Sequence, residues 1–200
     1  KESVEGLGAA AYKLTANLPS GRSVYTFCMC PGGYVVNASS EEGRIAVNGM
    51  SYHARDGKNA NSAVVVTVDP ADFGSDSPLA GMEFQRRLEE AAFKAGRGKI
   101  PVQLYEDFCK NQPSAGPGAV TPMIKGAYAW SNVRSIFPEE IGDALEMGIR
   151  EFDKKLKGYA RGDAVLSGVE SRTSSPVRIP RDETFQSSVR GLYPCGEGAG

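Results

Sequence analysis

The sequence lacks any apolar run of about eighteen residues, the length that a membrane-spanning helix needs. Its first residues do not form the basic and then apolar pattern of a secretory signal. It also lacks a charge excess, since 23 basic and 24 acidic residues leave a net charge of −1. These absences favour a cytoplasmic protein and disfavour membranes and nucleic acid as partners.

Potential metal ligands are scarce. The chain has one histidine, His53, and its four cysteines are too few and too scattered for a disulfide framework or a four-ligand metal site, so no metal is expected. Cys28 and Cys30 lie in an apolar run, on one side of an alternating strand, where both would be small buried hydrophobic residues. Because Cys30 directly precedes the turn Pro31-Gly32-Gly33, the alternative is that it lines a cofactor or substrate pocket.

Segments rich in β-branched and aromatic residues predict strands. Residues 24–30 are expected to be buried on both faces. The following turn and the apolar residues 34–36 predict a returning strand, so that the two form a hairpin. Residues 37–62 are polar and predict a long loop with a short strand at 45–47. Further strands are expected at 63–68, 164–169, 177–179 and 192–194.

Helices are predicted in the middle of the chain. Ser77-Pro78 is typical of a helix start and Gly96 of a helix end, with apolar residues at helical spacing between them. The clearest helix begins at Pro138, because apolar residues recur along one stripe as far as Leu156.

A short additional helix is expected at 102–110, and the Pro- and Gly-rich residues 112–121 predict a loop. Strands, then helices, then strands, without regular alternation, predict an α+β fold. We expect a mostly antiparallel sheet or barrel-like insert with a small helical subdomain at about 77–158.

Two motifs in the first third of the chain give evidence of function of different strength. Residues 6–11 fit the dinucleotide pattern G-x-G-x-x-A, but no strand-like segment precedes them, so we interpret the match as chance. The polar loop that holds His53 and Arg55 is a pocket candidate, because histidine transfers protons near neutral pH and arginine recognises carboxylates. A solvated surface loop is the alternative.

Residues 170–178 combine hydroxyl groups and arginines after a predicted strand. Such a cluster can bind an anion, which makes Arg172 and Ser174 candidates for substrate binding. A plain polar turn between strands explains the same residues equally well.

The end of the sequence is an apolar stretch followed by glycines around a single acid, Glu197. Glycines let the backbone approach a ligand closely, and a carboxylate can accept hydrogen bonds from sugar-type hydroxyls. The pattern therefore indicates a nucleotide or polyol contact, although a simple strand and turn remains possible. A glycine-rich turn with nothing after it leads us to expect that the natural chain continues.

This ending resembles the second FAD signature of flavoproteins with two dinucleotide-binding domains, a short strand and Gly-(Asp/Glu)-x-x-Gly before a helix. The stretches Y-T-F-C-M-C-P-G-G (25–33), N-G-M-S-Y-H-A-R-D (48–56), E-S-R-T-S-S-P-V-R (170–178) and the last ten residues resemble the bacterial uncharacterised FAD-dependent (NAD/FAD-utilising) dehydrogenase family. By this resemblance Glu197 would bind the ribityl chain of FAD. The turn around it would be shaped by Gly196, Gly198 and Gly200.

The resemblance implies that residues 1–190 are a substrate-side domain inserted into an FAD-binding domain, and that 191–200 begin the returning, truncated FAD segment. The first dinucleotide motif would be missing, so this part alone is expected to be inactive. Implied cofactors are FAD, with NAD(P)H as a candidate electron donor, and implied partners are a small-molecule substrate and the rest of the FAD-binding domain. The rival functions are a flavin-dependent RNA-modifying enzyme and a non-catalytic binding or assembly module, with the 138–156 helix as its interface.

Overall fold

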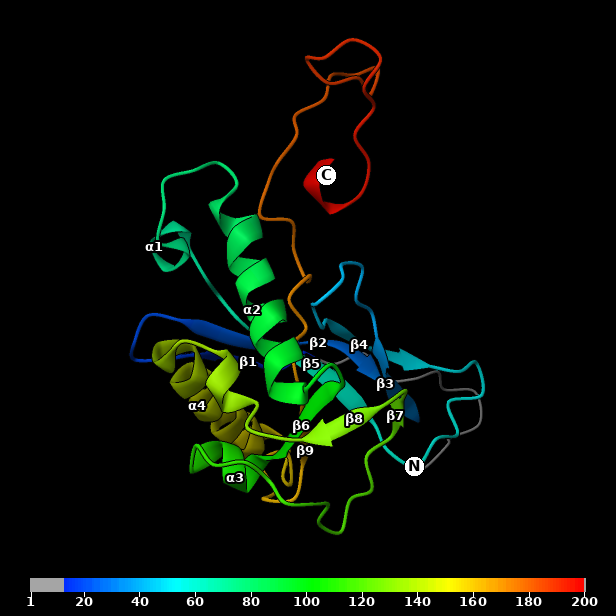
Figure 1. Ribbon diagram of the computed structural model, residues 1–200, viewed down its shortest axis with the longest axis vertical. Helices are drawn as coiled ribbons and strands as arrows, with labels where there is room; N and C mark the ends of the chain where they lie inside the picture. The colour runs from blue at the N-terminus through cyan, green and yellow to red at the C-terminus, as the bar shows by residue number, and fades with distance from the viewer. Residues whose placement is uncertain (1–12, 200) are drawn as a thin grey trace.

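The computed structural model describes residues 13–199, which form nine strands and four α-helices. The expected α+β class is confirmed. The strands make three separate three-stranded sheets, in the orders β1-β2-β5, β4-β3-β7 and β8-β6-β9, and none of these described sheets closes into a barrel. Helices α2 and α4 lie along one side of the molecule (Figure 1). Residues 6–11 and Gly200, named above, lie outside the described residues.

The first sheet is antiparallel and is built around a long central strand. Its strands are β1 (Thr15–Asn17), β2 (Ser23–Cys30) and β5 (Asn61–Val66). The expected burial of β2 on both faces is wrong, since Val24 and Thr26 are buried but Phe27 is 44% exposed. The pairing register shifts between Phe27 and Cys30, and Cys28 adopts a φ of 46°. This bulge interrupts the alternation that would place Cys28 and Cys30 on one buried side.

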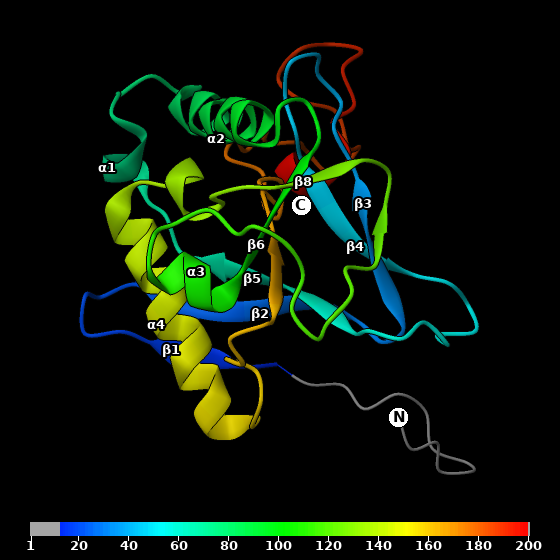
Figure 2. The same cartoon turned by 60° about the horizontal axis from the view of Figure 1, so that its bottom comes forward.

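The second sheet contains the strand that was expected to return as a hairpin. Its strands are β3 (Gly33–Asn37), β4 (Val47–Ser51) and β7 (Ile124–Lys125). The hairpin prediction is wrong, because β3 pairs antiparallel with β4 and parallel with β7 instead of with β2. Both edges of β2 are already occupied by β1 and β5, so β3 has no edge of it to join. Figure 2 shows β3 and β4 on the side of the molecule opposite α4.

The third sheet lies in the centre of the molecule. Its strands are β6 (Ile100–Leu104), β8 (Tyr128–Trp130) and β9 (Val165–Ser167). The helix predicted at 102–110 is therefore wrong in its first part, although α3 (Tyr105–Cys109) confirms the second. All five residues of β6 are buried between β8 and β9, and such a short, mostly apolar run without a period fits a buried strand as well as a helix. The strand predicted at 164–169 is confirmed as β9.

The remaining helices are α1 (Pro70–Phe73), α2 (Ala80–Gly96) and α4 (Glu139–Lys155). The predicted starts of α2 and α4 are confirmed to within two residues. The stripe of α4 is buried at Ile141, Ala144, Ile149 and Phe152, while Leu156, beyond the helix, is 46% exposed. Because the apolar face of α4 packs against the first sheet, α4 is a core element. This packing disfavours the use of α4 as an interface with another protein.

The C-terminal arm, residues 177–199, extends away from the body of the molecule (Figure 1). The strands predicted at 177–179 and 192–194 are wrong, because neither segment pairs in a sheet. Instead the arm ends in a 3₁₀ turn at Glu197–Ala199 that folds back, and the amide of Ile179 donates to the carbonyl of Gly198 at 2.7 Å. Its larger apolar side chains are exposed: Ile179, Phe185, Val189, Leu192 and Tyr193.

Two apolar clusters form the core. The larger one joins α2 to the second and third sheets: Ile45, Val47, Ala92, Ile100, Val102, Val133, Ile136 and Val169. The smaller one joins α4 to the first sheet: Ala16, Leu18, Val24, Ala144 and Phe152. Because the two clusters are separate, side chains between them can enclose a space.

Close packing of α4 on β2 makes a testable prediction about two glycines of one helix. A Cβ at Gly148 would lie 2.5 Å from Val24 Cγ1, whereas a Cβ at Gly142 would meet nothing nearer than Arg134 Cγ at 3.4 Å. We expect G148A to lower the free energy of unfolding by about 1–2 kcal/mol, because the clash exceeds the helix-propensity gain. G142A, the matched control, should gain up to about 1 kcal/mol in urea unfolding. Equal effects of the two substitutions would contradict this packing.

Candidate functional site

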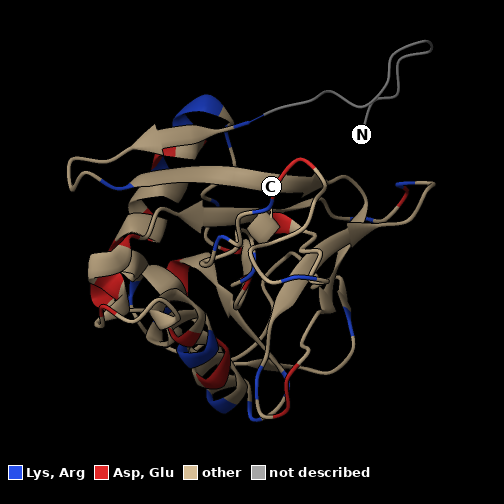
Figure 3. Ribbon diagram, turned by 90° about the horizontal axis from the view of Figure 1, so that it is seen from above, with Lys and Arg blue, Asp and Glu red and all other residues tan. Residues whose placement is uncertain are grey.

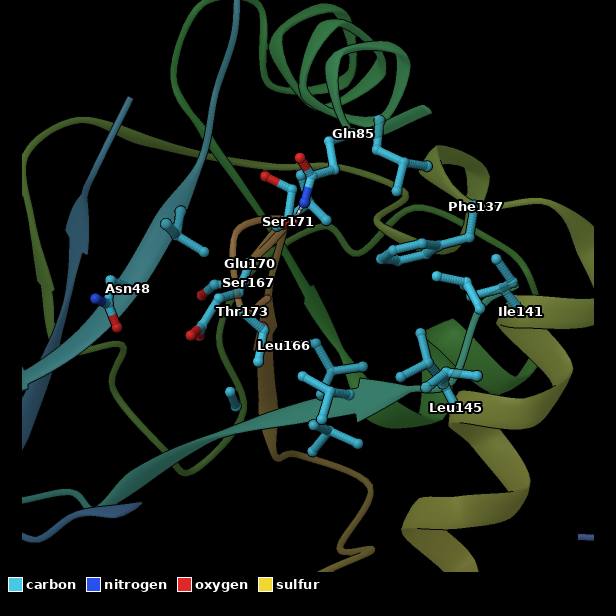
Figure 4. Close-up of a pocket in the computed structure, with 18 of the residues that line it drawn as sticks. Asn48, Gln85, Phe137, Ile141, Leu145, Leu166, Ser167, Glu170, Ser171 and Thr173 are labelled. Atoms are coloured by element: carbon cyan, nitrogen blue, oxygen red, sulfur yellow. Dashed lines mark hydrogen bonds between the residues drawn. The ribbon is translucent and has the colours of Figure 1, made fainter. Parts of the chain in front are cut away.

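A cavity of about 550 Å³ lies between the two core clusters. Its walls come from α2, α4, β4, β5 and residues 165–176, which we call the wall segment. Figure 4 shows Phe137, Ile141 and Leu145 on one side, facing the wall segment on the other. The volume falls within the range of small-molecule pockets, and the lining is mostly aliphatic and aromatic.

The wall segment is fixed to α2 by an ion pair whose acid is buried and whose arginine side chain is 42% exposed. Glu89, on α2, is fully buried, and it accepts from Arg172 Nε at 2.8 Å and from Arg172 Nη2 at 2.9 Å. Ser171 Oγ adds a third hydrogen bond to the same carboxylate at 2.6 Å. Both carboxylate oxygens and two guanidinium nitrogens are therefore used, which is the strong bidentate form of this interaction.

The environment of Glu89 keeps its carboxyl ionised. Burial opposes ionisation, but the hydrogen bonds from Arg172 and Ser171 outweigh that effect and hold the pKa of Glu89 below the ordinary value. A second link lies one turn earlier on α2, where Gln85 Nε2 donates to the carbonyls of Ser171 at 2.7 Å and Ser174 at 3.3 Å (Figure 4). The first part of the wall segment is held by backbone hydrogen bonds, through β9, Gly168 and Val169, and the part from Ser171 onward is held to α2 by these side chains.

The polar part of the cavity is small. Figure 4 shows Ser167, Glu170 and Thr173 gathered along the wall segment, and Asn48 of β4 also lines the cavity. Thr173 Oγ1 and Asn48 Oδ1 are buried without a hydrogen-bond partner. Among residues 13–199 Glu170 forms neither an ion pair nor a hydrogen bond, and desolvation raises its pKa. Buried polar atoms left unpaired in a cavity are the atoms that a ligand would satisfy.

The predicted pocket residues Cys30, His53 and Arg55 lie elsewhere. The structure does bring two of their segments together, because Ser51 Oγ donates to the carbonyl of Pro31 at 3.0 Å and the backbone of Arg55 packs against Gly32. However, His53 and Arg55 are exposed, and none of the three lines the cavity. A role for them in chemistry stays a prediction.

The predicted anion-binding residues have structural tasks in the described chain. Besides Glu89, the guanidinium of Arg172 donates to Ser40 Oγ at 2.7 Å and to Glu41 Oε1 at 3.2 Å, so all three of its nitrogens are engaged. Ser174 lines the cavity and is tied to Gln85 through its carbonyl. Their binding of substrate stays a prediction.

The predicted flavin turn is an exposed feature of the C-terminal arm. Gly196 has a φ of 86°, which favours glycine, and Gly198 would place a Cβ 2.9 Å from the carbonyl oxygen of Val177. Glu197 is exposed, and no other described residue holds its carboxylate. The glycines and the free acid fit a close backbone approach to a hydroxyl-bearing ligand, while the strand expected before them is not formed.

Sequence reasoning missed Glu170 and Asn48 as cavity residues. Glu170 was noted only as part of a cluster of hydroxyls and arginines that would bind an anion. The only signal was position, because Glu170 directly follows the apolar segment 164–169 that was predicted to be a strand. For Asn48 the sequence carries no comparable signal, because its position depends on the pairing of β3 and β4.

In the view of Figure 3, the basic residues of the described chain are interspersed with acidic ones. Acidic and basic positions alternate along α2 in Figure 3, and many arginines are paired, such as Arg22 with Asp72 at 2.6 Å. In the part of the chain that the structure describes, no helix is long and apolar enough to cross a membrane. Over the same residues no three His, Cys, Asp or Glu side chains are grouped as a metal site would need.

Two comparisons with known proteins bear on this site. A family model described as "FAD-dependent protein, C-terminal domain-like" matches residues 1–173. A protein of Clostridium beijerinckii (strain ATCC 51743 / NCIMB 8052), described as "Uncharacterized protein", is 56% identical over 198 residues. That match covers 97% of this chain but 37% of the relative, so the chain spans little more than a third of its length.

The ion pair between α2 and the wall segment predicts that removing Arg172 lowers the free energy of unfolding more than removing Arg161 does. R172A leaves the buried Glu89 carboxylate without its cation and should lower the free energy of unfolding by about 3 kcal/mol. The control is R161A, which breaks the exposed pair with Asp163 and should change it by less than about 1 kcal/mol. Urea unfolding at neutral pH measures both, and similar losses would contradict the role assigned to the pair.

The isolated Glu170 predicts a pH-dependent stability difference. Burial raises the pKa of the Glu170 carboxyl in the folded state. The protonated carboxyl therefore contributes its full stability to the fold below the ordinary glutamate pKa of 4.5. That contribution is lost as the pH rises through the pKa that Glu170 has in the folded protein. We therefore expect E170Q to be more stable than the natural protein at neutral pH, by up to about 1 kcal/mol. The difference should vanish in acid. E183Q, a change of an exposed acid, should show no such pH dependence in thermal unfolding.

Proposed function

Since the chain belongs to the FAD-dependent protein, C-terminal domain-like family, we propose that it is the substrate-side part of an FAD-dependent oxidoreductase. In this proposal the cavity between the two cores receives the substrate, and the C-terminal arm leads into the FAD-binding part of the protein. When bound, FAD supplies the redox chemistry by taking up two electrons from a substrate. The residues of this chain bind and orient the substrate and shield it from water.

The observation that carries this proposal is the cavity itself. It is large enough for a small molecule, it is lined mainly by apolar groups, and its unpaired polar atoms are concentrated on the wall segment. A cavity of this kind is the expected site of a small-molecule enzyme. The bidentate pair of Glu89 and Arg172 keeps the wall segment rigid, which a binding site needs in order to orient its ligand.

The C-terminal arm supports the flavin part of the proposal. Glu197 presents a free carboxylate beside the glycine turn, where it would accept hydrogen bonds from the ribityl hydroxyls of FAD. The exposed apolar residues of the arm, such as Phe185 and Tyr193, would pack against the remainder of the FAD-binding part. The length of the Clostridium beijerinckii relative supports such a further part, because the match with this chain covers 37% of that protein. The first dinucleotide motif would lie in that further part.

The free carboxylate predicts a specific loss of flavin. In the full-length protein, E197A should weaken FAD binding by roughly tenfold or more, because a hydrogen bond to a charged group is worth about 1.5–3 kcal/mol. E183A is the matched control, since Glu183 is an exposed acid of the same arm. The flavin-to-protein absorbance ratio after gel filtration measures the effect. Full-length protein that purifies without flavin and does not take up added FAD would overturn the proposal.

A further inference from the structure

The cavity contains one charged side chain in an apolar setting. Among the described residues that line it, Glu170 is the only acid, and no lysine, arginine or histidine is present. The cations nearest in sequence are committed elsewhere, since Arg172 binds Glu89 from outside the cavity. An anionic ligand would therefore meet a negative charge and find no positive one, which disfavours carboxylate and phosphate substrates.

The unpaired atoms of the cavity lining, two on the wall segment and one on β4, can all act as acceptors. Besides the carboxylate of Glu170, they are the hydroxyl oxygen of Thr173 and the amide oxygen of Asn48. An ammonium group carries three N–H donors and one positive charge. On the wall segment it would supply a donor to Glu170 and to Thr173 and also the missing counter-charge of Glu170, whereas a neutral alcohol would supply no charge.

The side chains near Glu170 that come from other helices and strands do not supply a positive charge. Cys28, on β2, has its thiol pKa raised by desolvation and by the negative charge of Glu170, so the two groups are close enough to interact. A thiol is neutral when protonated and negative when ionised, so it cannot compensate a carboxylate. The opposite side of the cavity is apolar, with Phe137, Ile141 and Leu145 on and before α4 (Figure 4).

From these observations we propose that the cavity binds a primary amine with an apolar body, its ammonium group on Glu170 and Thr173 and its body against the α4 side. This assignment rests on the cavity being the substrate pocket proposed above, and it names the chemical class of that substrate. The aliphatic and aromatic lining provides the affinity for the body. The single carboxylate provides the preference for an amine over its alcohol and acid analogues.

The test uses three probes of one size and shape on the full-length protein: n-hexylamine, n-hexanol and n-hexanoate. Isothermal titration calorimetry should show that hexylamine binds at least tenfold more tightly than hexanol, and that hexanoate does not bind. E170Q should weaken hexylamine binding at least tenfold and leave hexanol binding unchanged, because only the amine uses the charge. T173V, which keeps the shape and removes the hydroxyl, should weaken hexylamine binding by a few-fold. E183Q should have no effect.

Three results would overturn the inference: hexanoate or hexanol binding as tightly as hexylamine, hexylamine binding unchanged in E170Q, or binding of none of the probes. E170Q removes no contact of the free protein, so loss of binding in it would not reflect unfolding. Flavin content is measured on the same samples. Hexylamine binding to protein that neither contains flavin nor takes up added FAD would overturn the oxidoreductase proposal and support the amine site, while flavin-loaded protein that does not bind hexylamine would do the reverse.

Discussion

The ion pair between Glu89 and Arg172 is the interaction on which the cavity depends. Backbone hydrogen bonds to Pro101 and Val47 hold Gly168 and Val169, and from Ser171 onward the segment is held by side chains that reach α2. A fully buried carboxylate that receives two guanidinium hydrogen bonds and one hydroxyl hydrogen bond allows little movement. By fixing residues 171 and 172, the pair also fixes Glu170 and Thr173 on either side of them, facing the cavity.

The cavity exists because the chain forms two apolar clusters instead of one. Helix α4 is drawn tightly onto β2 through Gly148, where no side chain separates the helix from Val24. Helix α2 packs on the second and third sheets in the other cluster. The side chains that remain between the clusters line a space, and Glu170, the one acid among its described lining residues, has its pKa raised by desolvation. A group in that condition is a recurrent mark of functional sites.

Membership of an FAD-dependent family and the geometry point to a division of labour along the chain. The body provides a pocket whose described lining holds a single acid, and the arm provides an exposed turn with another acid, Glu197. The two acids differ in what surrounds them. Glu170 is desolvated, whereas Glu197 is exposed; in the proposed function the first meets the charge of a substrate and the second meets the hydroxyls of FAD.

The sequence by itself determined the α+β class, the strands at 24–30 and 164–169 and the amphipathic helix after Pro138, because these depend on local composition and on a repeating apolar stripe. It also indicated the flavin family through short motifs. Only the tertiary structure decided that β3 pairs with β4 instead of β2, and that residues 100–104 are a strand, since both follow from which edges are free. The cavity could likewise not be predicted from the sequence. Arg172 binds Glu89, which lies more than eighty positions away in the chain, and this contact is decided by tertiary packing and not by the residues next to Arg172.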